Sequence, residues 1–441
     1  MEKVKIPKRI LGTLLNSLGA GVVPRVGLEY VAIGRNDEIA SVVRDLDNIS
    51  EGMGACRFII GKYGSGKSFL IGLIRSNAIG RGFVCADADL SPERRFIGTK
   101  GQGIATYREL IKNLSVKEYP DQGALEGIIS GWLGDMMSEV LASGQCKADS
   151  PELTEIMSSK IWEVLKKLRG FVNGFDFVKV IDCYFKGYIS GDEQLKQDSL
   201  RWLRGEFSTR LEARTSLLGV NSIIDDTNWY DYIKLYAVFF RFIGYKGFLV
   251  FFDECVNLYK IANRISRENN YEKILSMFND TMQGKAQSLG IFFGGTPQFM
   301  EDNRRGLFSY EALKSRLEAG RFTRDRMDMT GPVIRLSRLS DDELFALLTR
   351  LLTLHSSYYA YAPNLSDEQL LAFLSASLGR VGADELITPR EITRDFLGVL
   401  NVMMQEKDCD FEKLIGQVAS SPANSEDEDE EDDFDIPELT L

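Results

Sequence analysis

The sequence predicts an α/β fold in which a parallel sheet carries a large helical insertion and is followed by a helical lid. Three apolar runs support this prediction. The run at 58–60 ends in Gly-x-x-x-x-Gly-Lys-Ser at 61–68, a spacing typical of a phosphate-binding loop between a strand and a helix. Two later runs end in Asp253-Glu254 and in Thr296, and such continuous runs are typical of parallel strands buried on both faces. We therefore expect a P-loop core of the additional-strand class.

Composition places the chain among ordinary globular proteins and limits how it could bind a polyanion. Its 441 residues leave room for about two to four compact units, and 44% apolar and 27% charged residues are typical of such proteins. The net charge of −11 comes from the end of the chain, where 426–438 hold ten acids and no base. Because the rest is nearly neutral, contact with nucleic acid would need a local basic patch.

Residue usage disfavours several kinds of site. Six cysteines lie far apart without a Cys-x-x-Cys pair, which favours reduced thiols over a disulfide framework. The single histidine, His355, argues against a histidine-rich zinc centre. The N-terminus has no apolar signal segment, and no run reaches about 18 uncharged apolar residues. We expect a cytoplasmic protein that does not contact a membrane.

Residues 1–50 are expected to form an N-terminal helical segment and a turn beside the nucleotide. Apolar residues at helical spacing predict one helix that ends near Gly19. Further on, Gly34 and Arg35 precede an acidic helix start. This arrangement resembles the box that lies along the adenine in AAA+ ATPases, which makes Arg35 a candidate nucleotide-binding residue. A plain turn before a helix is the alternative.

The loop at 61–68 has the residues that phosphate binding requires. Glycines let the backbone turn through positive φ and bring N–H groups close to phosphate oxygens, and the helix N-terminus adds partial positive charge. Lys67 can reach the β- and γ-phosphates of ATP, and the Ser68 hydroxyl can bind Mg²⁺. The other candidate residues of the loop are Gly61, Gly64, Ser65 and Gly66. A glycine-rich turn that binds nothing is the alternative.

The first part of the core is expected to span 51–120. An apolar run at 82–89 ends in acids and predicts a second strand. The glycine-rich loop at 98–103 precedes a helical pattern. This loop could contact a phosphate backbone or a neighbouring subunit, or it could be a flexible connector.

Residues 121–245 are expected to be a helical insertion. Lys67 and Asp253 are 186 positions apart, whereas a βαβ unit needs only about 30 residues. The intervening patterns are mostly helical. The segment 229–242 is aromatic nearly all round, which favours a buried helix, and a platform on which single-stranded nucleic acid stacks is the alternative.

The second part of the core, 246–331, contains the candidate catalytic residues. Asp253 is expected to order the Mg²⁺ shell, and Glu254 is expected to be the general base that polarises the attacking water. Thr296 lies where the additional-strand class places its sensor of the γ-phosphate, although it could also begin a turn. Arg316 is the candidate finger that acts on a neighbouring subunit, which would imply an oligomer or a partner.

Residues 332–420 are expected to form the lid, a short strand followed by a helical bundle. Three helix starts, at Ser340, Ser366 and Thr388, have the spacing of a capping box. Arg390 lies at the third start, where this class carries its second sensor. A cation is unfavourable at a helix N-terminus, so a phosphate partner would explain it, and a solvated arginine is the alternative.

Residues 421–441 are expected to be a disordered acidic tail, because a run of like charge with few apolar residues cannot form a core. The end of the tail resembles the acidic docking tip of bacterial single-stranded DNA-binding proteins. That tip ends in a Phe carboxylate, whereas this chain continues past Phe434 to Leu441. A plain solubility tail is the alternative.

A more specific resemblance rests on the loop at 61–68 and on three further stretches. These are Ala-Asp-Ala-Asp-Leu-Ser-Pro-Glu-Arg-Arg at 86–95, Gly-Gln-Gly-Ile-Ala-Thr-Tyr-Arg-Glu-Leu at 101–110 and Thr-Pro-Arg-Glu-Ile at 388–392. With them the chain resembles the ATP-binding proteins of bacterial BREX phage-defence systems, of the BrxD type, over nearly all residues before the acidic tail. That family is similar to the initiator-type AAA+ ATPases and is often encoded beside a DNA helicase.

The motifs and the resemblance together imply an ATPase that uses ATP and Mg²⁺ in antiviral defence and acts on DNA or on a DNA-bound helicase partner. A nucleotide-dependent switch that recruits a partner with little steady turnover is the alternative. A small-molecule kinase is disfavoured by the Asp253-Glu254 pair and by the lid pattern. Direct DNA binding and a homo-oligomer stay open at this point.

Overall fold

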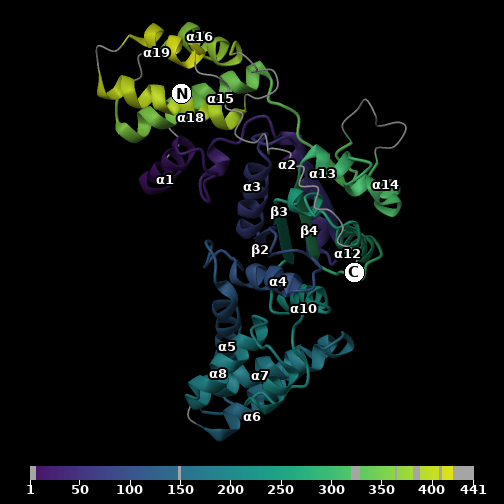
Figure 1. Cartoon of the computed structure of the whole chain (residues 1–441). Coiled ribbons are helices and arrows are strands. Elements are labelled where there is room, and N and C mark those ends of the chain that lie inside the picture. Colours follow the sequence, from purple (N-terminus) through teal and green to yellow (C-terminus); the bar gives the residue numbers. More distant parts are fainter. Residues whose placement is uncertain are drawn as a thin grey trace. The chain divides into compact units, whose positions relative to one another are not determined.

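The computed structural model describes residues 6–147, 150–318, 328–362, 365–380, 388–406 and 410–420 (Figure 1). The chain divides into two compact units. One is Arg35–Ser337, and the other joins Met1–Gly34 with Arg338–Leu441. The acidic tail predicted at 421–441 lies outside the described residues. The finer boundaries that the sequence suggests remain predictions.

A five-stranded sheet forms the centre of the Arg35–Ser337 unit. Its strands are β1 (Ala55–Ile60), β2 (Val84–Asp89), β3 (Phe248–Asp253), β4 (Leu289–Gly295) and β5 (Val333–Arg335). Neighbouring strands pair in parallel in the order β2-β3-β4-β1-β5. Strand β4 therefore lies between the strand that leads into the phosphate loop and the strand that ends in Asp253. This order confirms the predicted P-loop fold of the additional-strand class.

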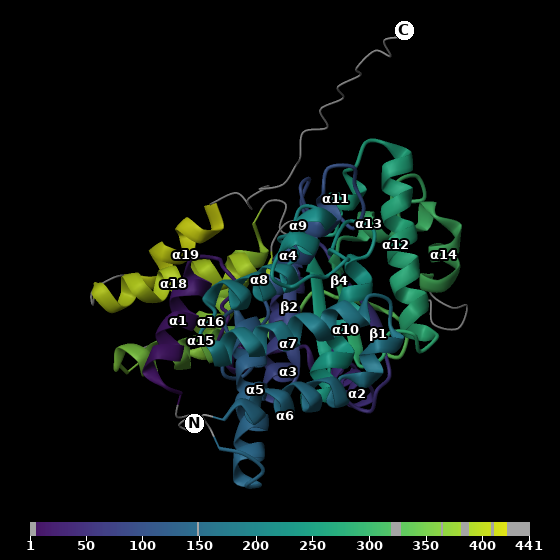
Figure 2. The ribbon, with the colours of Figure 1, turned by 90° about the horizontal axis from the view of Figure 1, so that it is seen from below.

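Helices cover both faces of the sheet. They are α2 (Asn36–Ser50), α3 (Lys67–Gly80), α4 (Gln102–Lys112), α11 (Val256–Tyr259), α12 (Arg264–Met282), α13 (Pro297–Glu301) and α14 (Glu311–Leu317). Successive strand residues point to opposite faces, so Ile59 and Phe251 pack with α2 and α3. Phe58 and Phe252 pack on the other face, with α4, α12 and the helix α10 (Trp229–Phe242). Helices α12 and α14 lie side by side in Figures 1 and 2.

Each described element between residues 121 and 245 is helical, as the sequence patterns predict. These elements are α5 (Ala124–Ala142), α6 (Pro151–Val164), a 3₁₀ turn (Lys166–Gly170), α7 (Gly174–Ser190), α8 (Glu193–Leu203), α9 (Arg210–Thr215) and α10 (Trp229–Phe242). Figure 1 shows α6 at the end of this unit that points away from the sheet. Figure 2, seen from below, has this end nearest the viewer.

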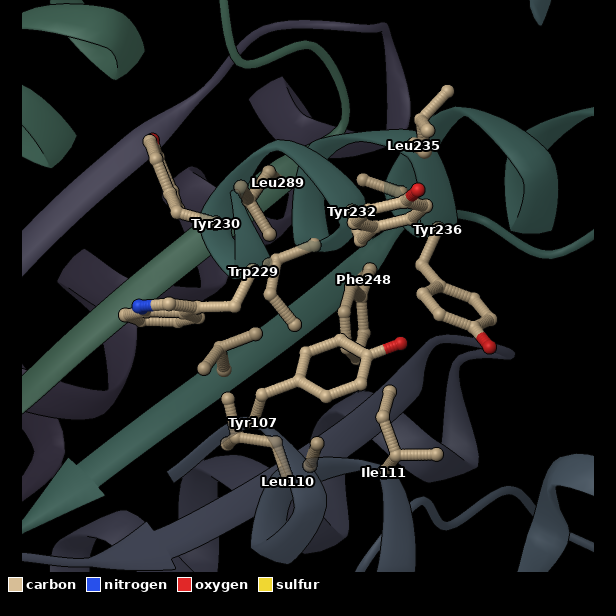
Figure 3. Close-up of a cluster of buried hydrophobic side chains, with 14 of the residues drawn as sticks. Tyr107, Leu110, Ile111, Trp229, Tyr230, Tyr232, Leu235, Tyr236, Phe248 and Leu289 are labelled. Carbon is tan, nitrogen blue, oxygen red and sulfur yellow. The ribbon is translucent and has the colours of Figure 1, made fainter. Parts of the chain in front are cut away.

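The aromatic helix α10 belongs to the protein core. Trp229 and Tyr236 are fully buried, and Figure 3 shows their rings among side chains of α4, β3 and β4. The Trp229 indole N–H donates to the Phe96 carbonyl at 3.1 Å, and the Tyr236 hydroxyl donates to the Leu203 carbonyl at 3.1 Å. Buried aromatic residues with polar tips need such acceptors. The prediction of a buried helix is confirmed, and α10 does not offer these rings to nucleic acid.

The second unit is a helical bundle with accurately predicted helix starts. Its elements are α1 (Lys8–Gly19), a 3₁₀ turn (Leu28–Tyr30), α15 (Asp341–Tyr359), α16 (Asp367–Leu378), α18 (Pro389–Gln405) and α19 (Phe411–Ser420). All three capping boxes are present, at Ser340, Ser366 and Thr388. Helix α1 packs on α15 and α18. His355 of α15 is buried, and its ring nitrogens lie 2.9 Å from the Tyr361 hydroxyl and 3.1 Å from Asn401 Oδ1.

Candidate functional site

The phosphate loop begins where β1 ends and leads into α3, as predicted. Gly64 and Gly66 adopt φ values of +69° and +94°, a region that favours glycine. A Cβ on Gly61 would overlap the Ser65 side chain, so this position also requires glycine. The Gly61 N–H donates to the Gly295 carbonyl at 3.1 Å, which anchors the start of the loop to the end of β4.

The Ser65 hydroxyl gives the clearest sign that the loop is built around a ligand. Among the described residues, its oxygen is buried and has no hydrogen-bond partner. Buried polar groups without a partner are rare in folded proteins because they lose their bonds to water. A phosphate oxygen held in the glycine loop would supply the missing partner.

Lys67 lies at the first position of α3 and curls back over the loop. Its ammonium donates to the carbonyls of Gly61 at 2.9 Å and Lys62 at 3.0 Å. The same ammonium lies 5.2 Å from the centre of the Tyr63 ring. The positive charge is therefore held above the loop, at the helix N-terminus where an anion would be stabilised.

The structure brings Ser68 and Asp253 together, although they are 185 positions apart in the sequence. The Ser68 hydroxyl donates to Asp253 Oδ2 at 2.7 Å. The other carboxylate oxygen, Oδ1, accepts the backbone N–H of Glu254 at 2.9 Å. A Cβ on Gly294 would overlap this carboxylate, so the glycine at the end of β4 leaves the space that Asp253 occupies.

Glu254 lies just beyond β3 in a strained backbone conformation. Its φ is +54°, which is uncommon for a residue other than glycine, and such conformations concentrate at functional sites. The residue is exposed. Hydrogen bonds hold its neighbours: the Cys255 N–H donates to the Gly294 carbonyl at 3.0 Å, and the Asn257 amide donates to the Glu254 and Leu90 carbonyls at 3.2 and 2.8 Å.

Asp89 lies at the same edge of the sheet as Asp253, although no role was predicted for it from the sequence. It pairs in register with Asp253 because β2 and β3 are parallel neighbours. Partial desolvation, followed by repulsion from Asp253 and Asp87, raises the pKa of Asp89 above its usual range. The sequence did contain a signal for this pair, because two predicted strands both end in acids and parallel strands bring their carboxyl ends to one edge of the sheet.

Arg35 forms a hydrogen bond to the backbone of the phosphate loop. Its guanidinium is buried and donates to the carbonyls of Ser65 and Ser337, both at 3.0 Å. It also pairs with Glu38 at 3.1 Å. The side chain thus connects the start of α2, the phosphate loop and the segment that follows β5.

Thr296 follows β4 and is buried. Its hydroxyl oxygen accepts the Phe299 N–H at 3.3 Å and caps the N-terminus of α13. A hydroxyl that accepts one hydrogen bond can still donate another. The residue follows Gly295, whose carbonyl anchors Gly61, so it lies on the same edge as the loop.

Two predicted arginines are not joined to these groups. Arg316 is exposed on α14, and among the described residues its guanidinium bonds only to Ala312 and Ser315 of its own helix. Arg390 is exposed in the first turn of α18, in the other compact unit. Their predicted roles stay predictions.

The donor set at the sheet edge suits a hard cation with few protein ligands. Across the described residues, no three His, Cys, Asp or Glu side chains gather in a way that could hold a metal ion by themselves. Mg²⁺ commonly binds through one or two protein oxygens together with phosphates and waters. Ser68 and Asp253 supply two such oxygens beside the loop, so the residues present fit Mg²⁺ that arrives with a nucleotide.

Comparisons with known proteins agree with this geometry. In the described part of the chain, no helix is both long enough and apolar enough to cross a membrane. No curated protein matches the chain. A family model described as BREX system ATP-binding protein BrxC/D matches residues 6–419. The chain therefore belongs to this family of ATP-binding proteins of the BREX defence system.

Proposed function

We propose that the protein hydrolyses ATP with Mg²⁺ and acts, within a BREX defence system, on DNA or on a DNA-bound helicase partner. The observation that carries the hydrolysis proposal is the 2.7 Å hydrogen bond between Ser68 and Asp253. It places the hydroxyl of the phosphate loop against the acid of a separate strand, where both oxygens could share one cation.

Each residue of the edge has a distinct role in this proposal. Lys67 would turn from the loop carbonyls to the β- and γ-phosphates, and Ser68 and Asp253 would hold Mg²⁺, which neutralises phosphate charge when bound. Glu254 would accept the proton of the attacking water.

Two further residues would support these groups. Thr296 would donate its hydroxyl proton toward the γ-phosphate. Arg35 would act as a positioning residue, because its bond to the Ser65 carbonyl holds the loop in place.

Arg316 and Arg390 would complete the positive charge around the γ-phosphate. Arg316 is exposed on α14, so we propose that it acts on the site of a neighbouring copy or partner. Arg390 would act from the helical bundle of its own chain. Its alanine variant should lose most turnover and also bind ATP more weakly, whereas Arg316→Ala should leave ATP affinity unchanged.

A nucleotide-dependent switch is the second candidate. One observation favours it: Arg316 makes no described contact with the nucleotide motifs. A single copy would then lack a finger and turn over slowly until a partner supplies the charge. Steady turnover that responds to DNA or a partner would argue against the switch, whereas turnover that stays slow while ATP promotes recruitment of a partner would agree with it.

The Glu254→Gln variant tests the hydrolysis proposal. An amide cannot accept the proton, so ATP should stay bound while phosphate release stops. Glu311→Gln is the matched control, because Glu311 is an exposed acid on α14 and should leave turnover unchanged. Phosphate release by Glu254→Gln at the parent rate would show that the base is misassigned.

A further inference from the structure

A patch of cations and apolar side chains lies where α6 ends and α7 begins. We name it the basic–aromatic patch and define it as Trp162, Lys166, Lys167, Arg169, Val172 and Phe175. Figure 1 shows α6 and α7 at the end of their unit that points away from the sheet. The Lys167 ammonium lies 5.8 Å from the centre of the Phe242 ring, and Phe242 ends α10 shortly before β3 begins at Phe248. The patch therefore lies toward the N-terminal end of β3, whereas Asp253 ends that strand at the nucleotide edge.

The apolar part of the patch faces solvent. Val172 and Phe175 are 66% and 56% exposed, and Val164 beside them is also exposed. The Phe175 ring lies 5.2 Å from the Trp162 ring, tilted by 51°. The Arg169 guanidinium covers Trp162 at 4.9 Å from the ring centre. Arg169 and Phe175 thus both contact the half-buried Trp162 ring, and Phe175 is the ring of this group that is exposed to solvent.

The cations of the patch lack acidic partners. Between residues 160 and 175 the sequence has four bases and one acid. Within the described residues, Lys166, Lys167 and Arg169 form no ion pair with a carboxylate, although all three are exposed. Two other cations of the insertion are paired: Lys186 with Asp182 at 2.7 Å and Arg201 with Glu212 at 2.9 Å.

We infer that this patch binds single-stranded nucleic acid. Unpaired cations attract a phosphate backbone, and an exposed ring beside them offers a face on which an unpaired base can stack. A duplex keeps its bases stacked inside and would leave the Phe175 ring unused. This inference rests on the proposed action on DNA and names the surface that would contact the strand. Because the chain before its acidic end is nearly neutral, such contact needs a local basic patch.

Binding of a fluorescent 20-nucleotide oligothymidine, followed by anisotropy over a range of salt concentrations, tests this inference. Phe175→Ala should weaken binding by at least about fivefold, the lower end of what stacking one base contributes. Lys166→Ala with Lys167→Ala should make the slope of log K against log salt shallower by about 1.4, since each phosphate contact on a single strand contributes about 0.7.

Matched controls separate the patch from general effects. Tyr188→Ala removes another exposed ring of α7, 52% exposed, and Arg210→Ala with Arg214→Ala removes two exposed cations of α9. These controls should bind as the parent does. All variants should keep the basal ATP turnover of the parent, so a failure here is distinguishable from a failure of the hydrolysis proposal.

Three results would overturn the inference: no binding by the parent, equal binding by parent and patch variants, or equally tight binding of a duplex of the same length. Competition by polyglutamate at the same charge concentration would also overturn it, because that result assigns the patch to an acidic protein. Loss of binding in Phe175→Ala and in the lysine double variant, with intact controls, would support it.

Discussion

Two parts of the Arg35–Ser337 unit, the nucleotide edge of the sheet and the aromatic core around α10, use their polar groups in opposite ways. In the core, Trp229 and Tyr236 are fully buried and donate to backbone carbonyls. At the edge, the buried Ser65 oxygen has no partner among the described residues, and Glu254 has a left-handed backbone. These two core rings have their hydrogen bonds within the protein, although the buried Tyr230 hydroxyl of α10 has no partner among the described residues. The edge differs because its unpartnered hydroxyl lies in a glycine loop beside the Ser68–Asp253 pair.

Because the two parts differ in this way, stability and nucleotide binding should respond to different substitutions. Changes in the core should lower the free energy of unfolding, and they should affect nucleotide binding only through loss of the fold. Changes at the edge should alter ATP affinity or turnover with little loss of stability, since strained or unpaired groups contribute little to folding. The predictions below test this separation.

The largest effect is expected for Trp229→Ala in the core. Removing a buried ring and its hydrogen bond should lower the free energy of unfolding by about 3–5 kcal/mol, as measured by urea denaturation. The control is Phe175→Ala, because that ring is exposed and should cost less than about 1 kcal/mol. If Trp229→Ala left stability unchanged, the core would not stabilise the unit as described.

A similarly large effect, on rate alone, is expected for Arg316→Ala. An arginine finger can contribute a factor of about 10³ or more in turnover, while ATP affinity and melting temperature should hold. Mixing this variant with Glu254→Gln should restore some activity if assemblies exchange subunits. Lys314→Ala on the same helix is the control. If Arg316→Ala hydrolysed ATP at the parent rate under conditions that stimulate the parent, Arg316 would not be the arginine finger.

Lys67→Ala should affect binding more than stability. Loss of the charge that faces the phosphates should weaken ATP binding by roughly 10²-fold or more, measured by titration calorimetry. The control is Lys62→Ala, since Lys62 is an exposed loop lysine whose carbonyl, not its ammonium, contacts Lys67. Unchanged affinity in Lys67→Ala would count against the phosphate-loop assignment.

The smallest effect is expected from His355 in the helical bundle. Burial lowers the pKa of His355, so the unfolded chain takes up the proton more readily. The contribution of neutral His355 to the free energy of unfolding should be complete above the ordinary histidine pKa of about 6.5. As the pH falls below about 6.5, this contribution should decline by at most about 1.4 kcal/mol per pH unit. Urea denaturation between pH 5 and 7 should show a shallower pH dependence in His355→Gln, and an equal dependence would contradict this assignment.

Features with a short-range signal were predicted well from the sequence. The phosphate loop, the strands that end in Asp253 and Gly295, and the three capping boxes all depend on residues within a few positions of one another. Each has a fixed spacing imposed by backbone geometry. The strand order also followed, because β4 has to lie between β1 and β3 in the additional-strand class.

Contacts between distant residues were less accessible to prediction. The bond from Arg35 to the Ser65 carbonyl, the register that sets Asp89 beside Asp253, and the packing of α1 on α18 join segments far apart in the chain. No local pattern encodes the Arg35 and α1 contacts, and the acids that end both strands indicate only that Asp89 and Asp253 share an edge of the sheet. The sequence did identify Arg35, but the structure shows its bonds to protein carbonyls, which the adenine-side resemblance alone did not suggest.

The most direct test of the central claim is a double-mutant cycle on Ser68 and Asp253, measured as ATP affinity with and without Mg²⁺. If the two oxygens share one cation, Ser68→Ala and Asp253→Asn should each reduce the gain in affinity that Mg²⁺ brings. The double variant should then lose little more than either single variant, with a coupling of about 0.5–3 kcal/mol. Fully additive losses, or a Mg²⁺ dependence that survives in both single variants, would contradict a shared site at the junction of the phosphate loop and β3.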